Sequence, residues 1–229
     1  MWSAARKGMR YANKSKFMTR RRKRFAKHYP NINNAIKPVY GFKGLRSTVN
    51  FMKGMINAEI KRFDTTASVT PTATPGIVLL SDIAAGDDVG NRDGNSILAK
   101  YNTGTVQMSI AAASTLVEGR VLFFIDTQNN GSAPAAADIL EAPTNVLSPL
   151  NRDNTQRFTI LNDIHITLSN TGDKISTQKY YKKLGFHMRY TGTSTGTNNK
   201  NSLYVLYMST DNTNPPTINI YNRLAYYDN

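Results

Sequence analysis

The run MTRRRKRFAKHYP, residues 18–30, contains five consecutive cations, Arg20, Arg21, Arg22, Lys23 and Arg24, with Lys27 shortly after them. Such a run binds phosphates by charge rather than by base sequence. The same composition is typical of a nuclear localisation signal and of a mitochondrial transit peptide. The basic region extends over some sixty residues, which argues against a transit peptide and favours a tether that holds nucleic acid, with a nuclear address as a compatible second role.

A second candidate for chemistry is the loop GDDVGNRDG, residues 86–94, in which Asp87, Asp88 and Asp93 lie among Gly and Asn. Loops that bind hard cations such as calcium are often built this way. The spacing does not match an EF-hand, because the third and fifth positions counted from Asp88 are Gly90 and Arg92. Composition alone therefore leaves both an ordinary turn and a calcium site open.

Residues for catalysis are sparse. The chain has three histidines, His28, His165 and His187, without an HxH or HxxxH pair, and it has no Cys. His165 and His187 are out of phase with the apolar residues beside them, which predicts that both face solvent. No P-loop, GxGxxG or HExxH motif is present. We expect a protein that is not an enzyme.

The charge is divided unevenly along the chain. Residues 1–62 contain seventeen Lys or Arg and one acid, a net +16, whereas residues 63–229 contain twelve Lys or Arg and fourteen acids, a net −2. A domain that bound phosphates on its own surface should be basic, so we expect the nucleic-acid contacts to lie mainly in the N-terminal arm. Six tyrosines of the second part are then predicted to be core or subunit-interface residues: Tyr180, Tyr181, Tyr190, Tyr221, Tyr226 and Tyr227.

Residues 1–44 mix cations with Gly, Asn and Ser and show no sustained apolar period, which predicts a disordered arm. A short helix is predicted over residues 45–63, because apolar residues recur there at three- and four-residue spacing beside the cations Arg46, Lys53 and Lys61. Its apolar stripe consists of Val49, Met52, Ile56, Ile60 and Phe63. The stripe can pack on its own domain or on a neighbouring subunit, and the sequence leaves both open.

Residues 64–229 show β patterns. Runs of alternating or continuous apolar residues predict strands at 77–80, 105–111, 120–125, 158–168, 180–190, 203–208 and 218–221, with turns at 102–104, 129–132, 170–173 and 191–201 and a short helix at 135–142. Short strands at this spacing predict one all-β domain, a sandwich or jelly roll. No run approaches a membrane span or a signal peptide, so we expect a soluble protein made in the cytosol.

Three blocks carry a resemblance to a known family: MINAEIKRF at 55–63, GDDVGNRDGN at 86–95 and QRFTILNDIHITLSNTGDKI at 156–175. Their order resembles that in coat proteins of the satellite tobacco necrosis virus family, over roughly residues 48–175. The resemblance implies an eight-stranded antiparallel jelly roll, sixty copies of which close a small T=1 icosahedral shell with the arm inside. The long Arg-rich arm suggests a relative in a small circular single-stranded DNA virus.

The resemblance also implies binding residues. The family's arm helix contacts the genome through cations, and Lys53 matches one of them, whereas Asn50 and Gly54 replace family arginines. Calcium ions bind between the family's subunits: Asp87 matches a carboxylate on the threefold axis, and Thr171 matches a carbonyl facing the fivefold ion. A third site is implied by carbonyls matching Asp93 and Ser96 and carboxylates matching Glu59 and the penultimate Asp228.

The resulting hypothesis is a capsid protein of the virion that self-assembles and packages a single-stranded genome through its arm, with host nuclear import factors as further partners. Two alternatives stay open. One is a cellular RNA-binding or ribosomal protein with a basic tail. The other is a jelly-roll lectin or enzyme, which would need a convergent pocket that the sequence does not indicate.

Overall fold

The structure is a computed structural model that describes Val49 and residues 59–128, 132–193 and 198–228. The chain divides into two units, 1–57 and 58–229. The predicted disordered arm, and the predicted arm helix apart from the helical Val49 and residues 59–63, lie outside the described residues. The description that follows therefore concerns the second unit.

Two antiparallel sheets make up this unit. Sheet A has the strand order β1-β9-β3-β6-β7, and sheet B has the order β2-β8-β4-β5. The strands of sheet A are β1 (Ile60–Val69), β3 (Ser96–Ser109), β6 (Ile175–Tyr190), β7 (Asn198–Lys200) and β9 (Thr217–Asp228). Those of sheet B are β2 (Gly76–Leu79), β4 (Leu116–Asp126), β5 (Phe158–Ser169) and β8 (Ser202–Ser209).

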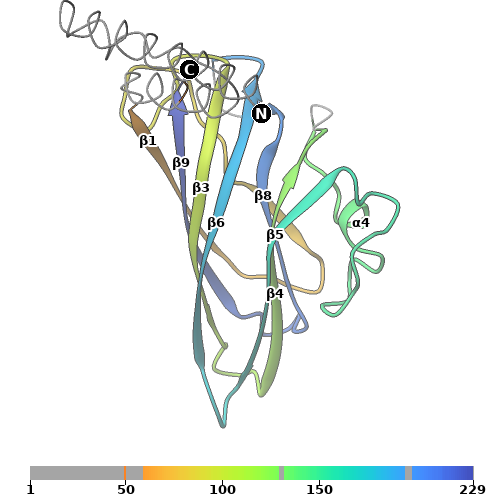
Figure 1. The fold of residues 1–229 in the computed structure, drawn as a ribbon. Helices are drawn as coiled ribbons and strands as arrows, with labels where there is room; N and C mark the ends of the chain where they lie inside the picture. Colours follow the sequence, from red (N-terminus) through yellow and green to blue (C-terminus); the bar gives the residue numbers. More distant parts are fainter. Residues whose placement is uncertain (1–48, 50–58, 129–131, 194–197, 229) are drawn as a thin grey trace, which may run out of the picture. The chain divides into compact units, whose positions relative to one another are not determined.

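The strand pairing is nested. Strand β1 pairs with β9, β2 with β8, β3 with β6 and β4 with β5, all antiparallel. This is the pattern of one long hairpin that has been rolled up. The further pairs β3·β9 and β4·β8 join the paired strands side by side into two sheets. Without the three-residue β7, eight strands remain in the arrangement of a jelly roll. Figure 1 shows β1, β9, β3 and β6 side by side. The predicted fold class is confirmed.

The main core lies between the two sheets. Alternate residues of β3 point into it on either side of a register shift between Ala99 and Tyr101, including Ile97 before the shift and Val106 and Met108 after it. Strand β4 contributes Val121 and Phe123. Their partners come from β5, β8 and β9, all of which carry runs of β-branched or large apolar residues that suit a half-buried pleated surface. Sheet A exposes its other face, as the alternating burial along β1 shows.

Sheet B is covered on both faces over β4 and β8, whereas β5 exposes alternate residues. Residues 132–157, which belong to the connection from β4 to β5 and contain the short helix α4 (Ala136–Ile139), pack on its outer face beside β5 (Figure 1). Ile139 and Leu140 contact a second core that includes Leu122 and Phe124 of β4. Because both faces are buried, β4 and β8 are apolar almost throughout instead of alternating.

Several boundaries differ from the predicted ones. The helix predicted over residues 45–63 is wrong at its end, since Ile60–Phe63 belong to β1, where Lys61 and Phe63 begin an inward alternation of period two. The turn predicted at 102–104 is also wrong, because these residues lie inside β3. Gly104 has a packing role there: a Cβ atom at this position would lie 2.2 Å from the Tyr180 ring.

Candidate metal and nucleic-acid sites

The acidic loop 86–94 is organised by a buried arginine. The Arg92 side chain is fully buried and donates from Nε to the Ile83 carbonyl (2.9 Å) and from Nη1 to the Gly94 carbonyl (2.6 Å). Its Nη2 donates to the Gly192 carbonyl, and its guanidinium lies 4.2 Å from the centre of the Tyr190 ring. A cation of the chain itself therefore joins the end of this loop to the segment before it and to the segment after β6.

Asp87 and Asp88 lie at the exposed tip of the loop, next to Val89, which is 82% exposed. Gly86 before them has φ +153°, a backbone conformation that side chains rarely adopt, and its amide bonds the Arg92 carbonyl (3.0 Å). The Asp87 carboxylate is thus presented outward on an ordered loop. One exposed carboxylate does not hold calcium, but copies meeting at a symmetry axis would supply the several oxygen ligands that the ion requires.

A lysine lies among the residues predicted for the third calcium site. Lys61 Nζ donates to Asp228 Oδ2 (3.0 Å), Asp93 Oδ1 (3.1 Å) and the Asn91 carbonyl (3.2 Å). The Asp93 amide also donates to Asp228 Oδ2 (2.6 Å). Asp93 and Asp228, 135 residues apart in the sequence, are therefore brought together, and the ammonium joins β1, the acidic loop and the end of β9.

The charge of Lys61 is stabilised in this cluster. Partial burial opposes it, but hydrogen bonds and charges from Asp228 and Asp93 outweigh that effect and raise the pKa of the ammonium. A divalent ion cannot share these oxygens with an ammonium, because two cations in one small oxygen cage repel strongly. Lys61 thus occupies Asp93 Oδ1 and Asp228 Oδ2, while the calcium ion predicted from the carbonyls of Asp93 and Ser96 and the carboxylates of Glu59 and Asp228 stays a prediction. Asp228 Oδ1 is buried and has no hydrogen-bond partner within the described residues.

Of the other predicted calcium residues, Thr171 lies apart, whereas Ser96 and Glu59 directly precede residues that pair with the end of β9, Ile97 with Asp228 and Ile60 with Tyr227. Thr171 is exposed in the turn between β5 and β6, at the start of β6, whereas the acidic loop adjoins the far end of β6 through the bond from the Tyr190 amide to the Asn95 carbonyl. Ser96 Oγ lies 3.2 Å from His187 Nδ1, and Glu59 is exposed before β1. Within the described residues, no group of three or more His, Cys, Asp or Glu side chains could hold a metal ion.

The predicted nucleic-acid residues Arg20, Arg21, Arg22, Lys23, Arg24, Lys27, Arg46 and Lys53 lie outside the described residues. His165 and His187 are exposed, as predicted. No helix among the described residues is long and apolar enough to cross a membrane.

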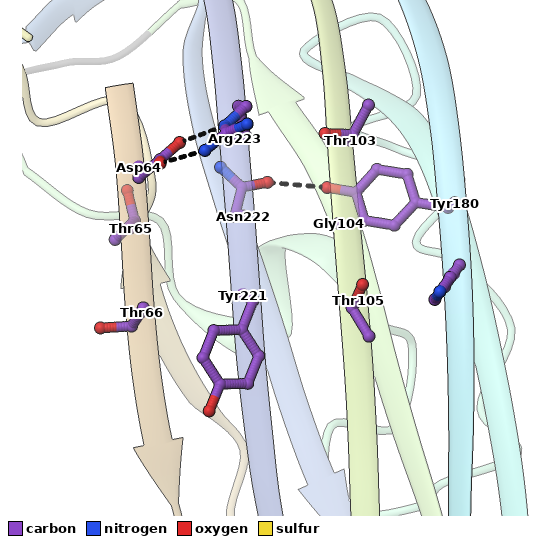
Figure 2. A pocket seen from close by; sticks show the side chains of 11 residues that line it. Asp64, Thr65, Thr66, Thr103, Gly104, Thr105, Tyr180, Tyr221, Asn222 and Arg223 are labelled. Atoms are coloured by element: carbon purple, nitrogen blue, oxygen red, sulfur yellow. Dashed lines mark hydrogen bonds and ion pairs between the residues drawn. The ribbon is translucent and has the colours of Figure 1, made fainter. Parts of the chain in front are cut away.

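The six tyrosines divide into two groups. Tyr190 and Tyr226 are buried, as predicted, and Tyr180 packs against Phe123 in the core with ring centroids 4.2 Å apart. Tyr181 and Tyr221 are 60% and 56% exposed on the outer face of sheet A, and Tyr227 is half-buried beside Lys100. A subunit-interface role for these three stays a prediction. Beside Tyr221 this face has a pocket of about 380 Å³ (Figure 2). The net charge of −2 for residues 63–229 had not indicated a pocket on this face.

A wrapped antiparallel sandwich with one covered and one open sheet is the architecture of a jelly-roll domain, a class that includes viral capsid proteins. Residues 43–229 match the family model of the satellite tobacco necrosis virus coat protein. The match covers more than half of the chain, and the chain belongs to this family. It is a viral coat protein, with the structural role and the place in the virion that this implies.

Two curated relatives agree with this assignment. The capsid protein of Satellite tobacco necrosis virus 1 is 32% identical over 136 residues, which cover 56% of this chain and 67% of that protein. The coat protein of Satellite tobacco necrosis virus 2 is 29% identical over 119 residues, covering 50% of this chain and 59% of that protein.

Among solved structures, an empty head of turnip yellow mosaic virus matches 75% of this chain and 82% of its own at 12% identity and a TM-score of 0.38. A pilus from Bacillus endospore appendages matches with a TM-score of 0.28 at 9% identity, over 76% of this chain and 92% of its own. These scores are low, and the fold assignment rests on the sheet topology of the chain itself.

Proposed function

We propose that sixty copies of this chain close a T=1 icosahedral shell and package a single-stranded nucleic acid genome through the basic N-terminal arm. The observation that carries the proposal is the division of charge, +16 in residues 1–62 against −2 in residues 63–229. A coat protein must separate two tasks, building a wall and neutralising phosphates. This chain gives each task to a separate part of the sequence.

The amount of charge fits a small genome. Sixty arms of +16 each bring 16 × 60 = 960 positive charges, which balance a genome on the order of one kilobase if each nucleotide carries one phosphate. We also propose entry into the host nucleus by import factors that bind the run Arg20–Arg24.

Exposed apolar side chains on the loops of the sandwich support assembly. Leu147 of the β4–β5 connection is 69% exposed and Ile175 at the start of β6 is 60% exposed, in addition to Val89 on the acidic loop. Contact with other copies would remove the apolar surface of these side chains from water. Calcium is proposed at two positions, at Asp87 where copies meet on a threefold axis and at the Thr171 carbonyl on a fivefold axis.

Deletion of residues 1–44 tests the division of tasks. The shortened protein should still form shells, because the described strands begin at Ile60, while its packaged nucleic acid should fall sharply. Nucleic acid is measured as the ratio of absorbance at 260 nm to that at 280 nm in purified particles. An arm-deleted protein that packages as much as the full chain would contradict the proposed role of the arm.

A further inference from the structure

The exposed face of sheet A carries an ordered array of polar and aromatic side chains. Residues directly opposite each other in an antiparallel pair point to the same face, so the registers of β1, β9, β3 and β6 define rows across the sheet. Three adjacent rows are Arg62–Ala225–Tyr101–Lys183, Asp64–Arg223–Thr103–Tyr181 and Thr66–Tyr221–Thr105–Lys179. The rows repeat about every 6.7 Å along the strands.

These rows are strongly cationic although the whole β domain is not. They hold Arg62, Lys179, Lys183 and Arg223, and Lys100 beside them places its Nζ 4.5 Å from the centre of the Tyr227 ring. Asp64 is the single acid in the three rows, and it is paired with Arg223. Five cations against one acid make this face positive, and the remaining acids of the domain lie elsewhere.

Aromatic rings lie between the cations. Tyr101 and Tyr181 stack with ring centroids 5.7 Å apart and an angle of 29° between their planes. Tyr221 stands next to the pocket of about 380 Å³, whose lining includes Asp64, Arg223, Thr105 and Lys179 (Figure 2). The pair Asp64–Arg223 holds the guanidinium in place through bonds of 2.7 and 2.6 Å, so this side of the pocket is preorganised.

We propose that the exposed face of sheet A is a second nucleic-acid site, which binds single-stranded nucleic acid with phosphates on Lys179, Lys183 and Arg62 and bases stacked on Tyr181 and Tyr221. A positive surface with interleaved aromatic rings is how sequence-independent single-strand sites are built. The basic segment of the chain ends at Arg62 inside β1, so it is joined covalently to an edge of this face. The inference rests on the proposed packaging function and extends it from the arm to the shell wall.

Cross-linking of the full chain to a 30-nucleotide oligothymidylate by ultraviolet light, followed by mass spectrometry of the peptides, is the direct test. The account predicts cross-links in the arm and also at Tyr181 and Tyr221. Cross-links confined to the arm would overturn the second site and leave the proposed packaging function standing. A chain without cross-links anywhere would contradict both.

A matched pair of charge variants tests the phosphate contacts. Lys183 pairs with Tyr101 and lies on the exposed face of sheet A. Its neighbour Lys182 pairs with the buried Asn102 and therefore lies on the opposite side of β6. Both lysines are exposed to solvent, so they differ in the face that they occupy. Lys179→Gln with Lys183→Gln should reduce the slope of log affinity against log salt by about 1.4, about 0.7 for each lost contact with a single strand. Lys174→Gln with Lys182→Gln removes the same charge and should leave the slope unchanged; equal slopes for the two variants would overturn the site.

The stacking contact is tested by Tyr181→Ser against Tyr181→Phe. The serine variant should bind the oligonucleotide about fivefold more weakly or worse, with an unchanged salt slope, because stacking on one ring is worth about 1 kcal/mol or more. The phenylalanine variant keeps the ring and should bind like the parent chain. Equal binding by both variants would show that the ring does not stack on a base.

Discussion

The ammonium of Lys61 supplies the positive charge that balances the carboxylates of Asp93 and Asp228. Two carboxylates and a carbonyl converge on one point, and each lies 3.0 to 3.2 Å from the ammonium. An ammonium in such a cage stabilises the local structure at any concentration of calcium. The calcium ion predicted for Asp93 and Asp228 stays a prediction, but the geometry favours a site that is independent of metal.

Replacing Lys61 by Met tests this interpretation. The change leaves Asp93 and Asp228 without their shared cation, and we expect the free energy of unfolding to fall by about 2 kcal/mol, the range of a hydrogen bond to a charged group. Calcium should restore part of this loss. The measurement is chemical denaturation in calcium and in chelator, with Lys174→Met, exposed in the β5–β6 turn, as the control.

The outcome is decisive in both directions. If Lys61→Met is as stable as the parent chain, the ammonium does not hold the cluster together. If it is less stable but equally so in calcium and in chelator, the two carboxylates do not form a latent cation site.

Tyr190 gives stability at neutral pH that is lost in alkali. Its hydroxyl donates to the Ser81 carbonyl (3.1 Å), and burial raises the pKa of this phenol above its usual value near 10. A raised pKa means that the folded state holds the proton more tightly, so the contribution is complete below about pH 10 and falls as the pH rises further.

The variant Tyr190→Phe should therefore lose less stability than the parent chain above about pH 10, as measured by chemical denaturation at a series of pH values. Tyr221→Phe, at an exposed position, is the control and should follow the parent curve. Parallel curves for all three proteins would refute the linkage to Tyr190.

The exposure or contacts of a single residue could be predicted from the sequence only where the pattern of its immediate neighbours was informative. The alternation around His165 and His187 predicted their exposure correctly. Lys61 was assigned to the polar edge of a helix, because its partners Asp93 and Asp228 are distant in the sequence and only the fold brings them to it. Arg92 occupied a ligand position of the EF-hand spacing, which excluded that motif without revealing that its side chain fills the loop.

At the scale of elements, the buried Arg120 adds polar contacts to the apolar packing that holds the β4–β5 connection on sheet B. Arg120 forms a two-bond ion pair with Asp163 of β5 (2.9 and 2.7 Å) and donates to the Val146 carbonyl (3.2 Å) and the Ser148 carbonyl (2.5 Å). It is 3% exposed. Truncation leaves a carboxylate and two carbonyls without this donor.

We predict that Arg120→Met lowers the free energy of unfolding by about 3 kcal/mol, as is typical when one partner of a buried pair is removed. Chemical denaturation measures the change, and limited proteolysis should show faster cleavage within residues 140–150. Arg152→Met changes an exposed arginine of the same connection and should have little effect. Equal stability of the two variants would show that Arg120 does not anchor the connection.

Strand positions were largely predictable, and strand lengths were not. The predicted strands at 77–80, 158–168 and 203–208 agree with β2, β5 and β8 within two residues. Strands β3 and β9 are much longer than predicted, because their exposed halves carry Thr, Asn and Tyr, and NTG at 102–104 has the composition of a turn. The Tyr180 ring over Gly104 explains this glycine, and only the pairing of β3 with β6 brings the two residues together.

At the scale of the whole molecule, an average concealed a local feature. The net charge of −2 for residues 63–229 suggested that the β domain does not bind phosphate. The strand registers place its acids mainly on loops and on sheet B and gather five cations on the open face of sheet A. Charge counted along a sequence cannot distinguish the two faces of a sheet unless the strand pairing is known.

The central claim is that this coat protein assembles into uniform closed shells around nucleic acid. Electron microscopy of the purified full chain, with absorbance at 260 and 280 nm recorded on the same fractions, tests it most directly. The account predicts closed particles of one small diameter with excess absorbance at 260 nm. A protein that stays monomeric across salt and calcium conditions, or forms shells without nucleic acid, would contradict it.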